Sequence, residues 1–482
     1  MPRSLLSNTH TVSQERLAVA DEALARWSAA WPQGHSDARI LEEYLVGRSA
    51  GDLDISGRAV DSPAREAAET AEVAADPSGS RHASDSPSVT AVPTLVVDDP
   101  DGSLSLVVAL AGAGRTAVVT DSAAAGEACR AARESLPEPV RSTVGVHRTV
   151  AEAAAALVGD RPAEGATAGS VGLRVVVHAP KQVALLRECL RMVEALATEV
   201  VVVGREKHMS RTLNRLLAEA YGRVDVSPGR AKSRLLVASA PKKRAPLPVS
   251  AAALTRPRVP VQSAAASPAP GVPEILVSAY AGTFGAAAAD PGSRLLVRAF
   301  AQRRSTLFAG GTDRMRVLDL GSGNGWLLAA VGALLPGSVL FGIDDSQAAV
   351  ESTALTAASV RPGEEPAVVA HVDATRPLPW VTGEGRSTDF AAGTFDLVTV
   401  NPPFHEGTTM TTDSAHALID TAVDLLAPGG RLVVVHNSHL RYRAHLQHRL
   451  VEVEQWARDR RFTVVSGVSP GSARGETRTP TS

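Results

Sequence analysis

The chain has 482 residues, more than one ordinary domain needs, so we expect two domains of roughly 100–200 residues each. Its 49 Lys and Arg nearly balance 51 Asp and Glu, which excludes a protein held on nucleic acid mainly by bulk positive charge. No apolar run is long enough for a membrane span, so we expect no membrane contact and a cytoplasmic protein. Cys129 and Cys189 form no CxxC and no Cys/His cluster. We therefore expect two buried thiols, no disulfide and no metal site. We also expect a monomer.

Composition divides the chain into segments. Residues 1–244 form the first predicted domain, interrupted at about 50–96 by a stretch rich in Ala, Ser, Asp, Glu and Pro that predicts a disordered insertion. Residues 245–274 carry proline at short intervals and predict an interdomain linker. The second domain is expected over 275–468, and the tail 469–482 is expected to be disordered.

Short apolar runs alternate with segments of helical spacing in both halves, which predicts two α/β domains with parallel sheets covered by helices. In the first half the predicted strands are 104–110, 115–120, 173–179, 198–204 and 233–239. In the second half they are 316–320, 338–344, 367–373, 395–400 and 431–436. The two halves therefore resemble two copies of one architecture.

A glycine-rich loop joins a predicted strand to a helix in VLDLGSGNGWLLAAV (317–331). Gly321, Gly323 and Gly325 permit a tight turn and let a ligand lie against the backbone at a helix N-terminus. A turn without a ligand and a dinucleotide site are the alternatives. In the first half, ALAGAGRT (109–116) retains some glycine but has no preceding acidic residue, so we predict that this half binds no cofactor.

Aspartates end three successive predicted strands, at Asp319, Asp344 and Asp373. Asp319 would repel a pyrophosphate but suits the ammonium of a sulfonium amino acid, Asp344 can accept from ribose hydroxyls, and Asp373 can accept from an adenine amine. This set fits S-adenosylmethionine, although each aspartate alone could cap the following helix. The candidate cofactor-binding residues are Asp319, Gly321, Ser322, Gly323, Asn324, Gly325, Asp344, Asp373 and Asn401.

The string NPPFH follows the fourth predicted strand. The Asn401 side-chain oxygen and the Pro402 carbonyl can both accept from one exocyclic amine, while Phe404 stacks on the ring that carries it. Holding the amine in this way aligns its nitrogen with an electrophilic methyl group, which is catalysis by positioning without metal or covalent intermediate. Asn401, Pro402, Pro403 and Phe404 are the catalytic candidates. His405 is a candidate substrate contact or a partner of the local backbone; the alternative for the whole string is a proline-terminated strand without a role.

With these two motifs, the second half resembles the class I S-adenosylmethionine-dependent methyltransferases. NPPFH, PGGRLVVVHNSHLRYRAHL (428–446) and AGTFGAAAADPGSRLL (281–296) are similar to the ribosomal RNA guanine-N2 methyltransferases of the RsmC/RlmG family. The resemblance covers roughly residues 275–466.

The resemblance implies two tandem Rossmann-like methyltransferase domains, of which the first is degenerate and the second is a seven-stranded catalytic domain. It implies methylation of N2 of a guanine in ribosomal RNA, with the RNA or a ribosomal subunit as partner. Phe284, Asp290 and Ser293 would lie near the cofactor or the target base. RNA-facing candidates in the first domain are Lys181, Lys207, His208, Lys232 and Arg234, and for most of them a solvated surface residue is the alternative. Alternatives are transfer to protein glutamine N5 or adenine N6, and a non-catalytic RNA-binding scaffold.

Overall fold

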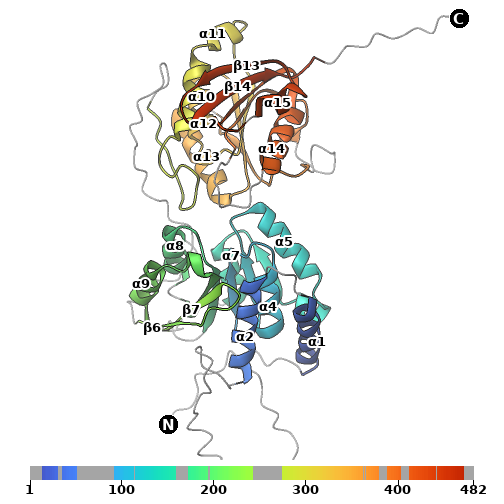
Figure 1. The fold of residues 1–482 in the computed structure, drawn as a ribbon, viewed down its shortest axis with the longest axis vertical. Coiled ribbons are helices and arrows are strands. Elements are labelled where there is room, and N and C mark those ends of the chain that lie inside the picture. Colours follow the sequence, from blue (N-terminus) through green and yellow to red (C-terminus); the bar gives the residue numbers. More distant parts are fainter. Residues whose placement is uncertain are drawn as a thin grey trace, which may run out of the picture. The chain divides into compact units, whose positions relative to one another are not determined.

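The computed structural model describes two compact units, residues 1–120 with 125–256, and residues 121–124 with 257–482 (Figure 1). The described residues within them are 14–30, 35–50, 92–112, 114–158, 172–193, 196–242, 274–361, 363, 365–378, 388–402, 412–440 and 442–471. Most of the predicted insertion, most of the linker and nearly all of the predicted C-terminal tail lie outside the described residues.

A seven-stranded sheet forms the centre of the first unit, in the order β3-β2-β1-β4-β5-β7-β6. Strands β3, β2, β1, β4 and β5 are parallel, whereas β7 runs antiparallel to both β5 and β6. The strands are β1 (Thr94–Val97), β2 (Thr116–Val119), β3 (Val144–His147), β4 (Leu173–His178), β5 (Ala197–Arg205), β6 (Tyr221–Val226) and β7 (Ser233–Pro241).

Helices cover both faces of this sheet because its central strands are continuous apolar runs that need burial on both sides. One face is covered by α1 (Gln14–Ala30), α2 (Ser36–Ala50), α4 (Ser103–Gly112), α5 (Ala123–Glu134) and α6 (Glu138–Arg141). The other is covered by α7 (Val150–Val158), α8 (Val183–Val193) and α9 (Arg211–Ala220), and a short 3₁₀ turn spans Glu206–His208.

The second unit repeats the same topology, with its sheet in the order β10-β9-β8-β11-β12-β14-β13 and β14 antiparallel to its neighbours. Two tandem Rossmann-like sheets of seven strands are therefore confirmed. The strands are β8 (Arg316–Leu320), β9 (Val339–Asp344), β10 (Val368–His371), β11 (Phe395–Val400), β12 (Leu426–Asn437), β13 (Val451–Arg458) and β14 (Phe462–Val468).

Two helical layers enclose the second sheet. Helices α10 (Pro291–Ala301), α12 (Trp326–Leu334) and α13 (Gln347–Val360) pack on one face, with α11 (Arg304–Leu307) beside them. Helices α14 (Thr412–Leu425) and α15 (Tyr442–Gln447) pack on the other, and a 3₁₀ turn spans Thr388–Phe390. Asp290 starts α10 by accepting a hydrogen bond from the backbone N–H of Ser293 at 3.0 Å, with Pro291 at the first helical position.

One predicted strand is wrong. Residues 104–110 belong to helix α4, whose residues Leu104 to Leu110 are all buried because α1 and α2 pack against it. A helix that is apolar all round lacks the polar face that distinguishes it from a buried strand. The strand that fills this place is β1, which begins at Thr94 and so overlaps the end of the predicted insertion.

The remaining nine predicted strands match observed strands. Cys129 and Cys189 are free and buried, as expected. Among the described helices, none combines the length and the apolar character that a membrane crossing requires.

Candidate active site

The candidate site lies where the parallel strands β8 and β11 end, next to the loop that leads into α12. β8 and β11 are hydrogen-bonded neighbours, with Asp319 directly opposite Thr399. Asn401 is the first residue beyond β11. Ligands of open α/β sheets bind at this edge because the loops after the carboxyl ends of the strands diverge there.

Asp319 is a buried carboxylate with one free oxygen. Its side chain is 1% exposed, and Oδ1 accepts a hydrogen bond from Thr399 Oγ1 at 2.8 Å. Oδ2 has no hydrogen-bond partner among the described residues. Burial, with a contribution from the charge of Asp344, raises the pKa of Asp319 to about 7. Asp319 lines the cavity, and its free oxygen is suited to a cationic donor, such as an ammonium group.

The three loop glycines have different surroundings. Gly321 has φ +78°, and a Cβ added to it would have no atom within 4 Å, so its backbone borders open space. Gly325 also has a positive φ, but a Cβ there would lie 2.6 Å from Thr353 Cα. Gly323 donates its N–H to Asp344 Oδ2 at 2.8 Å. Gly321 therefore leaves room for a ligand, whereas Gly325 is required for packing on α13.

Asp344 ends β9 and Asp373 lies two residues beyond β10, but neither residue lines this cavity. Asp344 binds the Gly323 and Ser346 N–H groups, and burial raises its pKa to about 6. Asp373 accepts from the N–H and hydroxyl of Thr375 and pairs with Arg376 Nε at 3.2 Å. Both carboxylates therefore shape their own loops, and each retains lone pairs for a ligand hydroxyl or amine.

Asn401 is held in one orientation by residues at the start of α10. Its Nδ2 donates to Asp290 Oδ2 at 3.0 Å and to Ser293 Oγ at 2.9 Å. Because the Asp290 carboxylate can only accept, the amide nitrogen must face it and the amide oxygen must face away. That oxygen, Oδ1, is buried without a partner among the described residues. It is an acceptor ready for a donor such as an exocyclic amine.

Phe284 and Asn324 close the cavity from the side of the segment before α10. Asn324 donates to the carbonyls of Ala286 and Ala288 and accepts from the Trp326 N–H, so its side chain anchors this segment. The enclosed space is about 20 Å³. Phe284, which lines this cavity, is 42% exposed.

The cavity brings together most of the predicted site. The predicted residues that line it are Phe284, Ser293, Asp319, Gly321, Ser322, Gly323, Asn324 and Asn401. Gly325 and Pro402 are adjacent in the chain but do not line it, and Pro403, Phe404 and His405 lie outside the described residues. Asp290 also lines the cavity, in agreement with the family resemblance.

Sequence reasoning missed Thr399, which orients Asp319. The sequence feature that could have identified Thr399 is a hydroxyl residue within the mostly apolar strand FDLVTV, in which Thr399 is fully buried. A buried hydroxyl in such a strand needs a partner, and Asp319 is opposite it.

The first unit has a loop at the same topological place, which the sequence prediction located wrongly. β1 and β8 occupy the same place in the two sheets, and each pairs in parallel with one strand on either side. Val97 and Leu320 are the last residues of these strands, and both are paired on both sides. Val97 of β1 therefore corresponds to Leu320 of β8. The counterpart of Gly321–Gly325 is therefore 98–102, and not ALAGAGRT, which covers the end of α4 and the turn into β2. Asp98 and Gly102 have positive φ, like Gly321 and Gly325.

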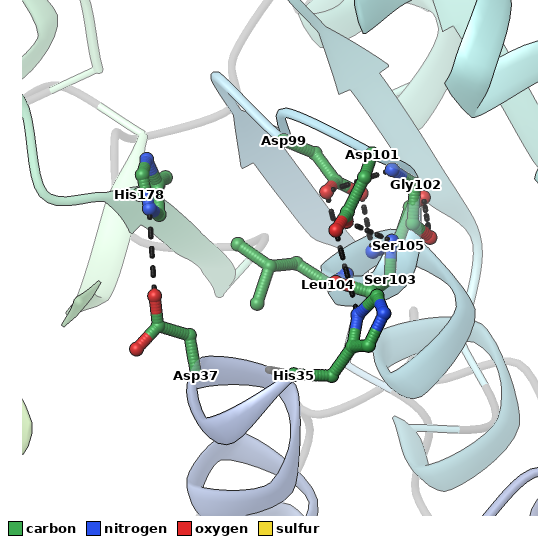
Figure 2. A network of polar contacts seen from close by, with 9 residues as sticks. All are labelled: His35, Asp37, Asp99, Asp101, Gly102, Ser103, Leu104, Ser105 and His178. Atoms are coloured by element: carbon green, nitrogen blue, oxygen red, sulfur yellow. Dashed lines mark hydrogen bonds and ion pairs between the residues drawn. The ribbon is translucent and has the colours of Figure 1, made fainter. Parts of the chain in front are cut away.

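Figure 2 shows the Asp99 carboxylate of the first unit's loop directed at the backbone of the residues that follow it. Asp99 is buried and accepts from the N–H groups of Gly102, Leu104 and Ser105, and burial raises its pKa. In this loop Val96 takes the place of Asp319, and His178, which pairs with Asp37 at 3.5 Å, takes the place of Asn401. The first unit therefore lacks the two acceptors, Asp319 and Asn401, that the second unit places at its cavity.

The RNA-facing candidates of the first unit are grouped in part. Desolvation, and then the charges of Lys207 and Lys181, lower the pKa of His208, so these three side chains are near one another. Arg234 pairs with Glu206 at 3.2 Å and is partly neutralised. Within the described ranges, no group of three or more His, Cys, Asp or Glu side chains is arranged to hold a metal ion.

Strand order, an aspartate at the end of the first strand and a glycine loop at a helix N-terminus together define the second unit as a class I S-adenosylmethionine-dependent methyltransferase fold. The model of the methyltransferase small domain matches residues 274–466, and that of the RLMG N-terminal domain matches residues 164–242. The chain belongs to the RsmC/RlmG family of ribosomal RNA methyltransferases.

The family assignment also rests on curated relatives. The ribosomal RNA large subunit methyltransferase G of Pseudomonas aeruginosa is 32% identical over 297 residues, covering 60% of this chain and 69% of the relative. That of Streptomyces coelicolor is 33% identical over 305 residues, covering 61% of this chain and 71% of the relative. Among solved structures, the T. thermophilus 16S rRNA N2 methyltransferase RsmC, in complex with AdoMet and guanosine, aligns with a TM-score of 0.57 at 21% identity. The alignment covers 85% of this chain and 92% of the RsmC chain, which supports a shared fold.

Proposed function

We infer that the protein is a methyltransferase that uses S-adenosylmethionine to methylate N2 of a guanine in ribosomal RNA. We place the guanine in the large-subunit RNA, following the names of the curated relatives. The observation that carries the proposal is a pair of buried acceptors at one cavity, Asp319 Oδ2 and Asn401 Oδ1, neither with a partner in the described part of the chain. Buried acceptors without partners are rare in folded proteins unless a ligand satisfies them.

The residues present fit the cofactor. Asp319 would hold the ammonium group of its methionine part, the backbone at Gly321 borders the space for it, and Asp344 would take the ribose hydroxyls. Asp373 remains our candidate for the adenine amine. When bound, S-adenosylmethionine supplies an electrophilic methyl group carried on a sulfonium.

The residues of the chain contribute to the reaction by positioning the guanine amine. Asp290 and Ser293 fix the Asn401 amide with its oxygen pointing away from α10, so Oδ1 accepts one hydrogen of the guanine amine. The Pro402 carbonyl would accept the other, and Phe404 would stack on the base. Two acceptors on one amine align its nitrogen lone pair with the methyl carbon. The methylated amine then loses its proton to solvent, so no general base is required of these residues.

The guanine must leave any duplex to reach this edge of the sheet, because a paired and stacked base cannot enter. We propose that the first unit holds no cofactor, since Val96 takes the place of Asp319 there, and that it contributes RNA contacts near Lys181 and Lys207. Bacterial ribosomal RNA is cytoplasmic, so the proposal places the protein there, and we keep the prediction of a monomer.

The test is mass spectrometry of nucleosides from large- and small-subunit RNA of cells lacking the protein. N2-methylguanosine should disappear from large-subunit RNA and return with the wild-type gene but not with an Asn401→Ala copy. Purified protein should transfer a labelled methyl group to RNA from the deletion strain. Unchanged methylation of both RNAs would refute the ribosomal substrate, and labelled glutamine or N6-methyladenine would identify the alternative acceptors.

A further inference from the structure

A second cavity in the second unit is not part of the site described above. It has a volume of about 600 Å³ and lies between the ends of β12, β13 and β14 and the segment leading through α15. Polar and basic side chains dominate its lining, among them His436, His439, Arg443, Gln455, Arg458 and Thr463. None of its described lining residues is acidic. A cavity with this lining attracts a negatively charged or hydroxyl-rich ligand.

His436 contributes a buried acceptor to this cavity. Its side chain is 3% exposed, and Nδ1 lies 2.9 Å from the Asn437 carbonyl oxygen. Because a carbonyl oxygen only accepts, Nδ1 must carry the hydrogen, and Nε2 of the neutral ring is an acceptor. Nε2 has no partner among the described residues. Burial lowers the pKa of His436, and the charges of His439 and Arg458 act in the same direction, so the neutral ring is favoured.

Arg443 and Arg458 are the cations of the cavity. Both are exposed, and neither forms an ion pair with a described residue. Arg449 differs, because it pairs with Asp420 at 3.5 Å and with Asp424 at 2.5 Å and does not line the cavity. The cavity therefore gathers two arginines without an ion-pair partner among the described residues, as a phosphate site requires.

The cavity is close to the candidate catalytic residue in the sheet. β11 and β12 are parallel neighbours with Val400 opposite Val434, so Asn401 and His436 follow that pair by one and two residues. Neighbouring strands lie about 4.8 Å apart. Val435 packs with the α10 face and Val434 with the α14 face, so His436 faces the α14 side of the same sheet edge. Asn401 is hydrogen-bonded to the start of α10, so the two residues lie at one sheet edge on its two faces.

We propose that this cavity is a ribose–phosphate subsite for a nucleotide flanking the target guanine, in which Arg443 and Arg458 bind the phosphate and His436 Nε2 accepts the 2′-hydroxyl. The proposal rests on the function inferred above, because it assumes that RNA is the substrate. It adds a contact that distinguishes RNA from DNA, since only the ribose of RNA offers a 2′-hydroxyl donor. An acidic peptide would satisfy the arginines but would give Nε2 no defined donor.

The test compares binding of a short single-stranded oligoribonucleotide and an oligodeoxyribonucleotide of the same sequence by fluorescence anisotropy. The wild type should prefer RNA about tenfold. His436→Ala should reduce this preference to about twofold by weakening RNA binding while leaving DNA binding unchanged, which a general loss of structure would not do. His436→Gln, which keeps a side-chain acceptor, should retain part of the preference.

Arg443→Ala combined with Arg458→Ala should weaken the binding of both oligonucleotides. It should also lower the slope of log K against log salt by about 0.7 for each phosphate that the variant no longer binds. Arg449→Ala is the matched control and should bind like the wild type. Thermal stabilisation by S-adenosylmethionine checks that each variant is folded.

Unchanged RNA binding in the double variant, or equal weakening of RNA and DNA binding in His436→Ala, would overturn the subsite. Normal RNA binding without methyl transfer to any ribosomal RNA would count against the proposed function instead.

Discussion

Thr399 and Asp319 lie opposite each other on β11 and β8, and the Thr399 hydroxyl donates to Asp319 Oδ1 at 2.8 Å. This bond leaves Asp319 Oδ2 as the only free carboxylate oxygen of that residue at the cavity. The strand that leads into Asn401 therefore also orients the acid expected to hold the cofactor. One strand thus links cofactor binding with substrate positioning.

The raised pKa of Asp319 predicts that cofactor affinity depends on pH. With a pKa of about 7, the carboxyl is protonated below that pH in the free protein, and a protonated acid is a poor partner for an ammonium group. The dissociation constant of S-adenosylmethionine should therefore fall as pH rises from 6 to 8, as measured by calorimetry. Asp319→Asn should bind about 10–100-fold more weakly at pH 8, because it loses a charge-assisted hydrogen bond.

The same pKa shift has a consequence for stability with the opposite sign. A carboxyl whose pKa is raised on folding stabilises the fold fully below its unfolded pKa and loses that contribution as pH rises through about 7. Without ligand, Asp319→Asn should therefore melt at a higher temperature than the wild type at pH 8, and the difference should shrink at pH 5. A lower melting temperature of the variant at pH 8 would contradict the buried, ionised carboxylate.

Thr399→Val tests the orienting bond itself. Valine keeps the shape of threonine but removes the donor to Asp319, so the carboxylate loses its hydrogen bond in a buried place. We expect cofactor affinity to fall about tenfold, corresponding to a cost of roughly 1–2 kcal/mol, and the pH dependence of binding to shift upward. Thr399→Ser retains the hydroxyl and should restore most of the affinity and the original pH profile.

Asn401 should separate methyl transfer from cofactor binding. Asn401→Ala removes the acceptor for the guanine amine, so turnover on ribosomal RNA should fall by at least about 100-fold while the cofactor affinity changes little. Ser293→Ala removes only one of the two bonds that orient the amide, and a smaller loss of about tenfold is expected. Full activity of Asn401→Ala would exclude the role given to its side chain.

The sequence predicted the fold class because its strand runs are punctuated by glycine, proline and aspartate at the strand ends. The strand predicted at 104–110 was wrong because these signals do not separate a buried helix from a buried strand. Helix α4 is buried on every side, so its sequence is a continuous apolar run like that of a buried strand. β1 has only four residues and follows a Pro- and Ser-rich stretch, so its sequence was assigned to the predicted insertion. Both segments take their secondary structure from burial in the folded domain, which cannot be read from a short stretch of sequence.

The candidate site shows a similar division. The types of residue at Asp319, Gly321 and Asn401 were predictable from motif chemistry, and the structure brings them to one cavity. The sequence could not show that Asn324 anchors the segment after Phe284, because its partners are backbone carbonyls 36 and 38 residues away. Equally, the orientation of the Asn401 amide depends on Asp290, 111 residues earlier in the chain.

Two glycines of the loop should respond differently to the same substitution. Both Gly321 and Gly325 have positive φ, so alanine costs about 1 kcal/mol of backbone strain at either position. At Gly325 the new Cβ would also lie 2.6 Å from the Thr353 backbone, so Gly325→Ala should destabilise the second unit by an additional 1–3 kcal/mol or so, measured by urea unfolding.

Gly321→Ala meets no atom within 4 Å, and its effect on unfolding should stay near the strain term. Its methyl group would instead enter the space expected for the cofactor, so S-adenosylmethionine binding should be lost while the fold is kept. If the two alanine variants had the same stability and the same cofactor affinity, the separation of a binding glycine from a packing glycine in this loop would be wrong.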